Sequence, residues 1–145
     1  AEGVMGEVFR CRNKGTELSR AVRKISLKKL SPHFAVAGLR LLQRLSHRNI
    51  VTMFDIYQSE RRCYIVAQYA SGGNLREALM YLTRKNALNT RDPQWVAQVI
   101  RGCLVALAYC RTLNPPVIHG NIKPENILLL TGGAQMLASP HPVLC

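Results

Sequence analysis

Two short segments of this chain carry groups suited to phosphate chemistry. Near the N-terminus, Gly3, Gly6 and Val8 fall close together. Closely spaced glycines let a backbone approach phosphate oxygens and point its N–H groups at them, although such a run on its own is equally typical of a hairpin turn. The second segment, residues 119–126, is a polar loop with a histidine, a lysine, a glutamate and two asparagines. The sequence therefore offers a phosphate-binding turn and a polar loop as its candidate functional site.

The composition describes a basic chain that can form a core. Of its 145 residues 48% are hydrophobic, and 20 Lys and Arg against 8 Asp and Glu give a formal charge of +12. That charge favours an anionic partner such as nucleic acid, an anionic lipid or an acidic protein. Aromatic residues, which stack on nucleic-acid bases, make up only 6%, so we expect no nucleic acid as partner. No apolar run reaches the roughly 18–20 residues of a membrane-spanning helix, so we expect no membrane span.

Cysteine and histidine show neither a metal-binding nor a disulfide pattern. The 5 cysteines include no CxxC pair, and the 4 histidines are scattered without the ligand spacing of a zinc site. Reduced cysteines indicate a cytoplasmic or nuclear protein. The chain starts without Met inside the glycine-rich run and lacks a secretory signal, so we interpret it as an internal fragment or an incomplete gene model.

The first half of the chain is predicted to form strands and the second half helices. The predicted strands span residues 4–11, 18–25, 50–57 and 62–69, with an amphipathic helix at 34–45. After a glycine break, helices are predicted at 75–82 and 93–113. The second of these is expected to be well buried, because Trp95, Val99 and Cys103 recur every four residues beside a second apolar row. The tail, residues 134–145, has no periodicity and is expected to be irregular.

Five motifs in this order resemble those of the protein kinase family. Residues 3–8 resemble the glycine-rich loop, with Ala1 in place of the first glycine, and residues 21–24 (AVRK) resemble the VAIK strand. Residues 47–51 (HRNIV) resemble the HPNIV turn, and residues 64–69 with two following glycines resemble the hinge strand. The strongest match is residues 119–126, HGNIKPEN against the family's HRDLKPEN. Within the family, the sequence is most similar to the calcium/calmodulin-dependent branch of the Ser/Thr kinases.

The resemblance implies an α+β, protein-kinase-like fold with ATP as its ligand. A small β-rich N-lobe with helix C would span residues 1–69, the first part of a helical C-lobe residues 70–133, and the tail the remainder. The residues implied to bind ATP are Gly3, Gly6, Val8, Ala21, Arg23, Gln68 and Tyr69. The residues implied to act at the reacting phosphate are Asn121, Lys123 and Asn126, of which Asn126 would also bind Mg²⁺.

Several family positions hold different residues here, and these predict a loss of activity. Asn121 stands in place of the catalytic Asp, and an amide cannot take a proton near neutral pH. Arg23 stands in place of the phosphate-binding Lys, and the Glu that should pair with it is replaced by Gly38. Gly120 replaces the Arg that precedes the catalytic Asp. No Asp follows Asn126 in the chain, so the Mg²⁺ site is expected to be incomplete.

Ala67 occupies the position that gates the pocket behind the adenine in the family. A residue as small as alanine would leave that pocket open. The same residue also fits as an ordinary core alanine, and the sequence leaves both interpretations open.

We therefore predict a partial, catalytically inactive kinase-like domain (a pseudokinase) with weak ATP binding, or a scaffolding role toward another protein. The first alternative is an incomplete gene model of an active ATP-dependent Ser/Thr kinase. An uncharged tail after Gly133 suits a reading frame that has run into untranslated sequence, whereas Gly38, Gly120 and Asn121 are not explained by truncation. The second alternative, a basic binding module, rests on charge alone.

Overall fold

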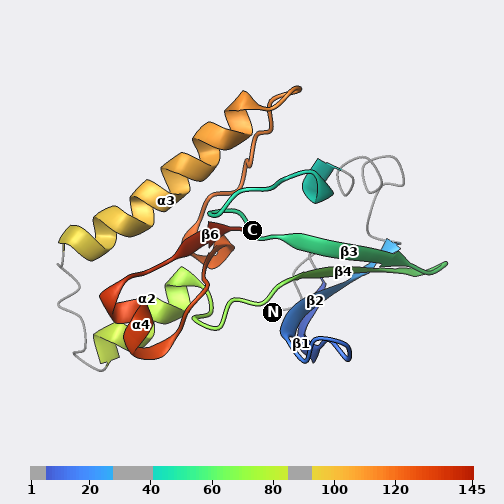
Figure 1. The fold of residues 1–145 in the computed structure, drawn as a ribbon, viewed down its shortest axis with the longest axis horizontal. Coiled ribbons are helices and arrows are strands. Elements are labelled where there is room, and N and C mark those ends of the chain that lie inside the picture. The colour runs from blue at the N-terminus through green and yellow to red at the C-terminus, as the bar shows by residue number, and fades with distance from the viewer. Residues whose placement is uncertain (1–5, 28–40, 85–92) are drawn as a thin grey trace. The chain divides into compact units, whose positions relative to one another are not determined.

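The computed structural model describes residues 6–27, 41–84 and 93–145 (Figure 1). The chain divides into two compact units. The sheet unit comprises Ala1–Ser46 and Thr52–Tyr69, and the helical unit comprises His47–Val51 and Ala70–Cys145. Gly3 and most of the helix predicted at 34–45, including Gly38, lie outside the described residues, and these points stay predictions.

Four antiparallel strands form the sheet unit, in the order β1-β2-β4-β3. They are β1 (Glu7–Arg12), β2 (Ser19–Ser26), β3 (Met53–Gln58) and β4 (Arg62–Gln68). The turn from β1 to β2 is shaped by Asn13, whose Oδ1 accepts the backbone N–H groups of Gly15 at 3.0 Å and Thr16 at 2.9 Å. This local hydrogen bonding by an asparagine side chain is a common turn signal. The predicted hairpin and the two later strands are confirmed.

In its described residues, the helical unit combines three helices with two short strands. In chain order it contains α2 (Leu75–Arg84), α3 (Pro93–Thr112), the single 3₁₀ turn η2 (Pro124–Asn126), β5 (Ile127–Leu129), α4 (Gly133–Ala138) and β6 (Pro142–Leu144). The Oδ1 atom of Asn74 accepts the Glu77 N–H at 2.9 Å and caps α2. Just upstream, the N–H of Gly72 donates to the carbonyl of Leu129 at 3.0 Å. The start of α2 is thereby attached to β5, directly after the polar loop.

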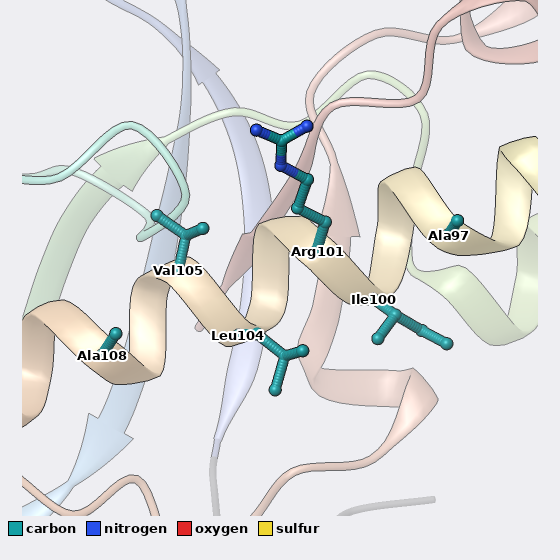
Figure 2. A pocket seen from close by; sticks show the side chains of 6 residues that line it. All are labelled: Ala97, Ile100, Arg101, Leu104, Val105 and Ala108. Carbon is teal, nitrogen blue, oxygen red and sulfur yellow. The ribbon is translucent and has the colours of Figure 1, made fainter.

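α3 buries one of its two apolar rows and exposes the other. Trp95, Val99 and Cys103 are buried, whereas Ile100 and Leu104 are 52% and 59% exposed. An open hollow of about 570 Å³ runs along the exposed side (Figure 2). It is lined by α3 alone, through Ala97, Ile100, Arg101, Leu104, Val105 and Ala108. Among the described residues, the predicted burial of this helix therefore holds for one of its two rows. None of the described helices is long and apolar enough to cross a membrane.

The tail is ordered, so the prediction of an irregular segment at 134–145 is wrong. β6 pairs antiparallel with β5, and Val143 and Leu144 are only 1% and 2% exposed. The indole Nε1 of Trp95 donates to the carbonyl of Met136 at 3.0 Å and attaches α4 to α3. A three-residue strand has no measurable periodicity, and the proline at its start, a position where strands accept it, gives no strand signal of its own. The pairing partner β5 lies outside the segment, and it decides the structure here.

Candidate functional site

Gly6 lies at a place where only glycine fits. Its φ of +78° is in the left-handed region, and a Cβ atom there would collide with the backbone carbonyl oxygen of Lys24. This close approach of Gly6, just before β1, to Lys24 of β2 is enough to explain why the position holds a glycine. A phosphate-binding role for Gly6 therefore remains a prediction.

Val8, Ala21, Arg23 and Ala67 share one face of the sheet, which we call the alanine face. In the register of the strands, Val8 is opposite Arg23 and Ala21 is opposite Ala67. Directly opposed residues of antiparallel strands point to the same side, and so do residues two apart along a strand. The sheet thus brings together four residues that the kinase resemblance places around a nucleotide.

The two neighbouring basic residues of β2 point to opposite faces. The Nζ atom of Lys24 lies 3.0 Å from Glu7 Oε2 on the face away from the alanines. Arg23 is opposite Val8 in β1 and Ile65 in β4. Of the two basic residues, only Arg23 can therefore serve a ligand on the alanine face.

Ala21 and Ala67 are directly opposed on the alanine face, and they are its smallest side chains. Opposed side chains in antiparallel strands have Cβ atoms about 4.5–5.5 Å apart, and here both side chains end at Cβ. Both alanines are half-buried, and neither belongs to the fully buried core. This placement favours the interpretation of Ala67 as a residue that leaves space beside a ligand.

Gln68 and Tyr69, the predicted hinge residues, lie at the end of β4. The backbone N–H of Gln68 donates to the carbonyl of Thr52 at 2.8 Å, which joins the end of β4 to the start of β3. The guanidinium of Arg10 lies over the Tyr69 ring, with Cζ 4.8 Å from the ring centroid. The tyrosine side chain is therefore fixed by a cation–π contact.

Arg10 is a residue of the alanine face that sequence reasoning missed. It is opposite Ala21 in the register, and its Nε and Nη2 atoms donate to Ser19 Oγ at 3.2 and 3.1 Å. Strand alternation from Val8 would have placed Arg10 on this face. The face thus carries the guanidinium groups of Arg10 and Arg23, together with that of Arg12, which is paired with Glu17 at the far end of β1.

In the helical unit, the polar loop is held by its own hydrogen bonds. The Nδ2 atom of Asn126 donates to the carbonyl of Asn121 at 2.9 Å, and the Asn121 N–H donates to His119 Nδ1 at 3.3 Å. The N–H of Asn126 donates to the Lys123 carbonyl at 2.9 Å. Because Nδ1 of His119 accepts, Nε2 carries the ring proton and donates to the Cys145 carbonyl at 3.2 Å. The loop therefore holds Asn121, Lys123 and Asn126 together, with the first two exposed.

Gly120 has the backbone conformation of a glycine position, with a φ of +70°. No atom lies within 4 Å of the place where its Cβ would be, so there is space for a side chain. The left-handed conformation, however, would strain any residue with a Cβ atom. The family's Arg at this position would therefore require a different local backbone.

Glu125 is paired with an arginine of α2. Its Oε1 atom lies 2.7 Å from Nη1 of Arg76. A hydrogen bond from its own backbone N–H, followed by the hydrogen bond from Arg76, holds the pKa of Glu125 below its ordinary value. The carboxylate is ionised but engaged, and it is not free to bind a metal ion.

The described residues do not fit a Mg²⁺ site. Among them, no group of three His, Cys, Asp or Glu side chains is placed to hold a metal ion. Asn126 offers one neutral amide oxygen, whereas Mg²⁺ demands octahedral oxygen coordination and is usually bound through carboxylates. Burial raises the pKa of Cys63, Cys103 and Cys110, which disfavours the thiolate form that binds metals.

Comparison with known proteins decides the family. The model of the protein kinase domain matches residues 1–138, a range that includes the glycine-rich run, all four strands of the sheet unit and the polar loop. The chain belongs to the protein kinase family. The predicted α+β kinase-like fold is thereby confirmed, with a small antiparallel sheet followed by helices.

The relatives are cyclin-dependent-kinase-like members of the kinase family. Human (Homo sapiens) cyclin-dependent kinase-like 4 is 32% identical over 140 residues, which cover 91% of this chain and 34% of that protein. Cyclin-dependent kinase-like 2 of Pongo abelii and of Homo sapiens is 30% identical over 155 residues, which cover 98% of this chain and 30% of the relative. The chain spans about a third of the length of these relatives. The comparisons do not support the calcium/calmodulin-dependent branch.

Proposed function

We propose that this kinase-family chain binds ATP weakly, with little dependence on Mg²⁺, and does not transfer its terminal phosphate. The observation that carries the proposal is Asn121, which stands where the family has its catalytic Asp. An amide cannot take the proton of an attacking hydroxyl near neutral pH, and loss of a general base costs about 10²–10⁴ in rate. The role that remains is a nucleotide-binding scaffold for another protein.

The alanine face supports ATP as the ligand. Val8 and Ala21 offer an apolar surface for a base, and Arg23 carries a positive charge two residues along β2, about 6.6 Å away. Arginine keeps the charge of the family's lysine, but its planar fork does not replace a point contact without repacking. Since Asn126 is a poor metal ligand on its own, Mg²⁺ is expected to add little to the affinity.

An incomplete sequence of an active kinase is the second candidate, and β6 favours it. The strand is buried and paired, so a tail read from untranslated sequence no longer supports this candidate, and the support comes instead from where β6 leads. The Cys145 N–H donates to the Asn126 carbonyl at 3.1 Å. A parent chain that continues past Cys145 would place its next residue beside Asn126, where a carboxylate would add a metal ligand. Asn121 and Arg23 are not explained by this candidate.

A nucleotide titration with and without Mg²⁺ tests the proposal. The chain is produced on a soluble fusion partner, and ATP binding is followed by calorimetry. We expect the two dissociation constants to agree within tenfold. A gain of tenfold or more with Mg²⁺, about 1.4 kcal/mol, would contradict the proposal, because it would show a metal site within residues 1–145.

Two neighbouring substitutions test where the nucleotide binds. Arg23→Ala removes the charge on the alanine face and should weaken ATP binding. Lys24→Ala removes the same charge from the opposite face, where Lys24 pairs with Glu7, and should leave binding unchanged. Equal effects of the two substitutions would show that only net charge matters and that the alanine face is not the site.

A further inference from the structure

β6 joins two parts of the helical unit that are far apart in the sequence. On one side it pairs with β5. On the other side it lies parallel to residues 47–51, which we call the anchor segment: the Leu144 N–H donates to the Asn49 carbonyl and the Val51 N–H donates to the Leu144 carbonyl, both at 2.9 Å. β6 is therefore hydrogen-bonded along both of its edges.

Asn49 adds a side-chain bond to this junction. Its Nδ2 atom donates to the Pro142 carbonyl at 2.8 Å, and the residue is only 6% exposed. Gly102 of α3 packs against both partners, since a Cβ there would collide with the Pro142 ring and lie 2.9 Å from Asn49 Nδ2. On the rim, His141 Nε2 donates to the Arg48 carbonyl at 2.9 Å. The start of β6 is thus fixed by the anchor segment and α3 together.

The far end of β6 is attached to the polar loop. The Cys145 N–H donates to the Asn126 carbonyl at 3.1 Å, and the His119 ring donates to the Cys145 carbonyl at 3.2 Å. His119 in turn accepts the Asn121 N–H. Both asparagines of the loop are therefore connected to Cys145, the residue that follows this strand.

We propose that Asn49 is a positioning residue for the polar loop and acts on it through β6. The Asn49 amide holds the Pro142 carbonyl at the start of β6. The three residues of β6 then set the position of Cys145, which is hydrogen-bonded to Asn126 and His119. Buried hydrogen-bonded groups of this kind are costly to disrupt, because the partner left behind is unsatisfied. The consequence for nucleotide handling rests on the proposed function, whereas the positioning itself does not.

The competing account is that the β5–β6 hairpin alone holds the loop and that Asn49 contributes only to overall stability. Trp95 provides a matched control, because its buried Nε1 also donates to a tail carbonyl, that of Met136. Trp95→Phe removes a buried N–H group that donates to a carbonyl of α4. Asn49→Ala removes a buried N–H group that donates to a carbonyl of β6. A purely structural role predicts the same response of the loop to both substitutions.

Hydrogen exchange followed by mass spectrometry tests the proposal in the whole chain on a soluble fusion partner, without nucleotide. For Asn49→Ala we expect exchange at least tenfold faster in residues 119–126 and 141–145, and little change in α2. For Trp95→Phe we expect faster exchange in α4 with the loop unchanged. A loop that stays protected in Asn49→Ala, or that loosens equally in Trp95→Phe, would overturn the proposal.

His141→Ala keeps the test decisive if Asn49→Ala does not fold. It removes the half-buried contact to the Arg48 carbonyl and leaves the core intact. We expect a smaller, severalfold acceleration in the same two segments, and in nitrogen NMR spectra a His119 ring whose Nε2 proton exchanges faster. An unchanged His119 signal would overturn the proposal. Since neither measurement uses nucleotide, failure of ATP binding would leave this result standing.

Discussion

The sheet unit and the helical unit hold their candidate residues in different ways. In the sheet unit, Val8, Ala21 and Arg23 sit on regular strands, and their common face follows from the strand register. In the helical unit, Asn121 and Asn126 sit on a loop whose attachments come from distant segments. The substitutions relative to the kinase family also differ between the two units. Arg23 in the sheet unit keeps the charge of the lysine it replaces, whereas Asn121 in the helical unit has no ionisable group in place of the aspartate.

This difference separates binding from transfer. A binding face built on strands can accept one altered side chain and retain part of its affinity. A reaction needs several groups in place at once, and the loss of one is not compensated by the others. We therefore expect the sheet unit to have kept weak nucleotide binding and the helical unit to have lost phosphate transfer.

The largest expected effect concerns the exposed row of α3. Ile100 and Leu104 leave an apolar surface beside an open hollow, and such surfaces promote association. We expect the isolated chain to self-associate at micromolar concentration and the double variant Ile100→Gln/Leu104→Gln to sediment mainly as a monomer. Tyr57→Gln, which changes a side chain 59% exposed in the sheet unit, is the control and should leave association unchanged.

A sharp monomeric melt of the unaltered chain would contradict this expectation. So would loss of association in the Tyr57→Gln control, since it would place the associating surface on the sheet unit. The polar double variant then serves as the background for the stability measurements below.

Two glycine substitutions compare the units directly. Gly102→Ala forces a methyl group against Pro142 in the helical unit, whereas a Cβ at Gly15 in the β1–β2 turn meets only Asn13 Oδ1 at 3.5 Å. Alanine in a helix would otherwise gain about 1 kcal/mol over glycine, but overpacking of about 1–3 kcal/mol outweighs this gain. Urea unfolding should show a clear loss for Gly102→Ala and almost none for Gly15→Ala. Greater stability of Gly102→Ala would mean that β6 does not pack on α3 as described.

A smaller effect is expected where the alanine face is filled. Ala67→Phe places a ring beside Ala21, the residue opposite it on the alanine face. ATP analogues with a bulky group on the adenine should lose at least fivefold in affinity, while the unfolding midpoint changes little because Ala67 is only half-buried. Large destabilisation with unchanged analogue binding would show that Ala67 is an ordinary core alanine.

The smallest effect is the pH dependence of Glu125. Its pKa is lowered in the folded chain by its own backbone N–H and by Arg76, so its contribution to stability is present above the ordinary Glu pKa. The contribution is lost as the pH falls through the lowered value. Glu125→Gln should therefore unfold at lower urea than the parent at pH 7 and converge with it in acid. If the difference in urea midpoint between the variant and the parent stayed constant with pH, the Glu125–Arg76 pair would be excluded as its source.

Local signals are the ones that could be predicted from the sequence. The Asn13 turn, the alternation of β1 and β2 and the polar loop each depend on residues a few positions apart, and the structure has all three. Periodicity shows which residues of α3 are apolar but not which row finds a partner, so the sequence does not tell the buried row from the exposed one. The position of Arg10 on the alanine face could have been predicted, because it lies two residues after Val8 in the same strand.

β6 and its attachments could not be predicted, because their cause lies outside the segment. Pro142 is held by Asn49, 93 residues earlier in the chain, and the strand itself is three residues long. Nothing in such a short run distinguishes it from an irregular tail. The same holds for Glu125, whose pairing with Arg76 of α2 removes it from the possible metal ligands.

Phosphate transfer by a repaired chain tests the central claim most directly. The triple variant Arg23→Lys/Gly38→Glu/Asn121→Asp restores the family's base and its lysine–glutamate pair but adds no second metal ligand beside Asn126. Labelled ATP, Mg²⁺ and a generic basic peptide are incubated with the parent chain, Asn121→Asp and the triple variant on the soluble fusion partner. The account predicts incorporation at background for all three. Incorporation that rises with Asn121→Asp alone would contradict it, because the helical unit would then possess a working metal site.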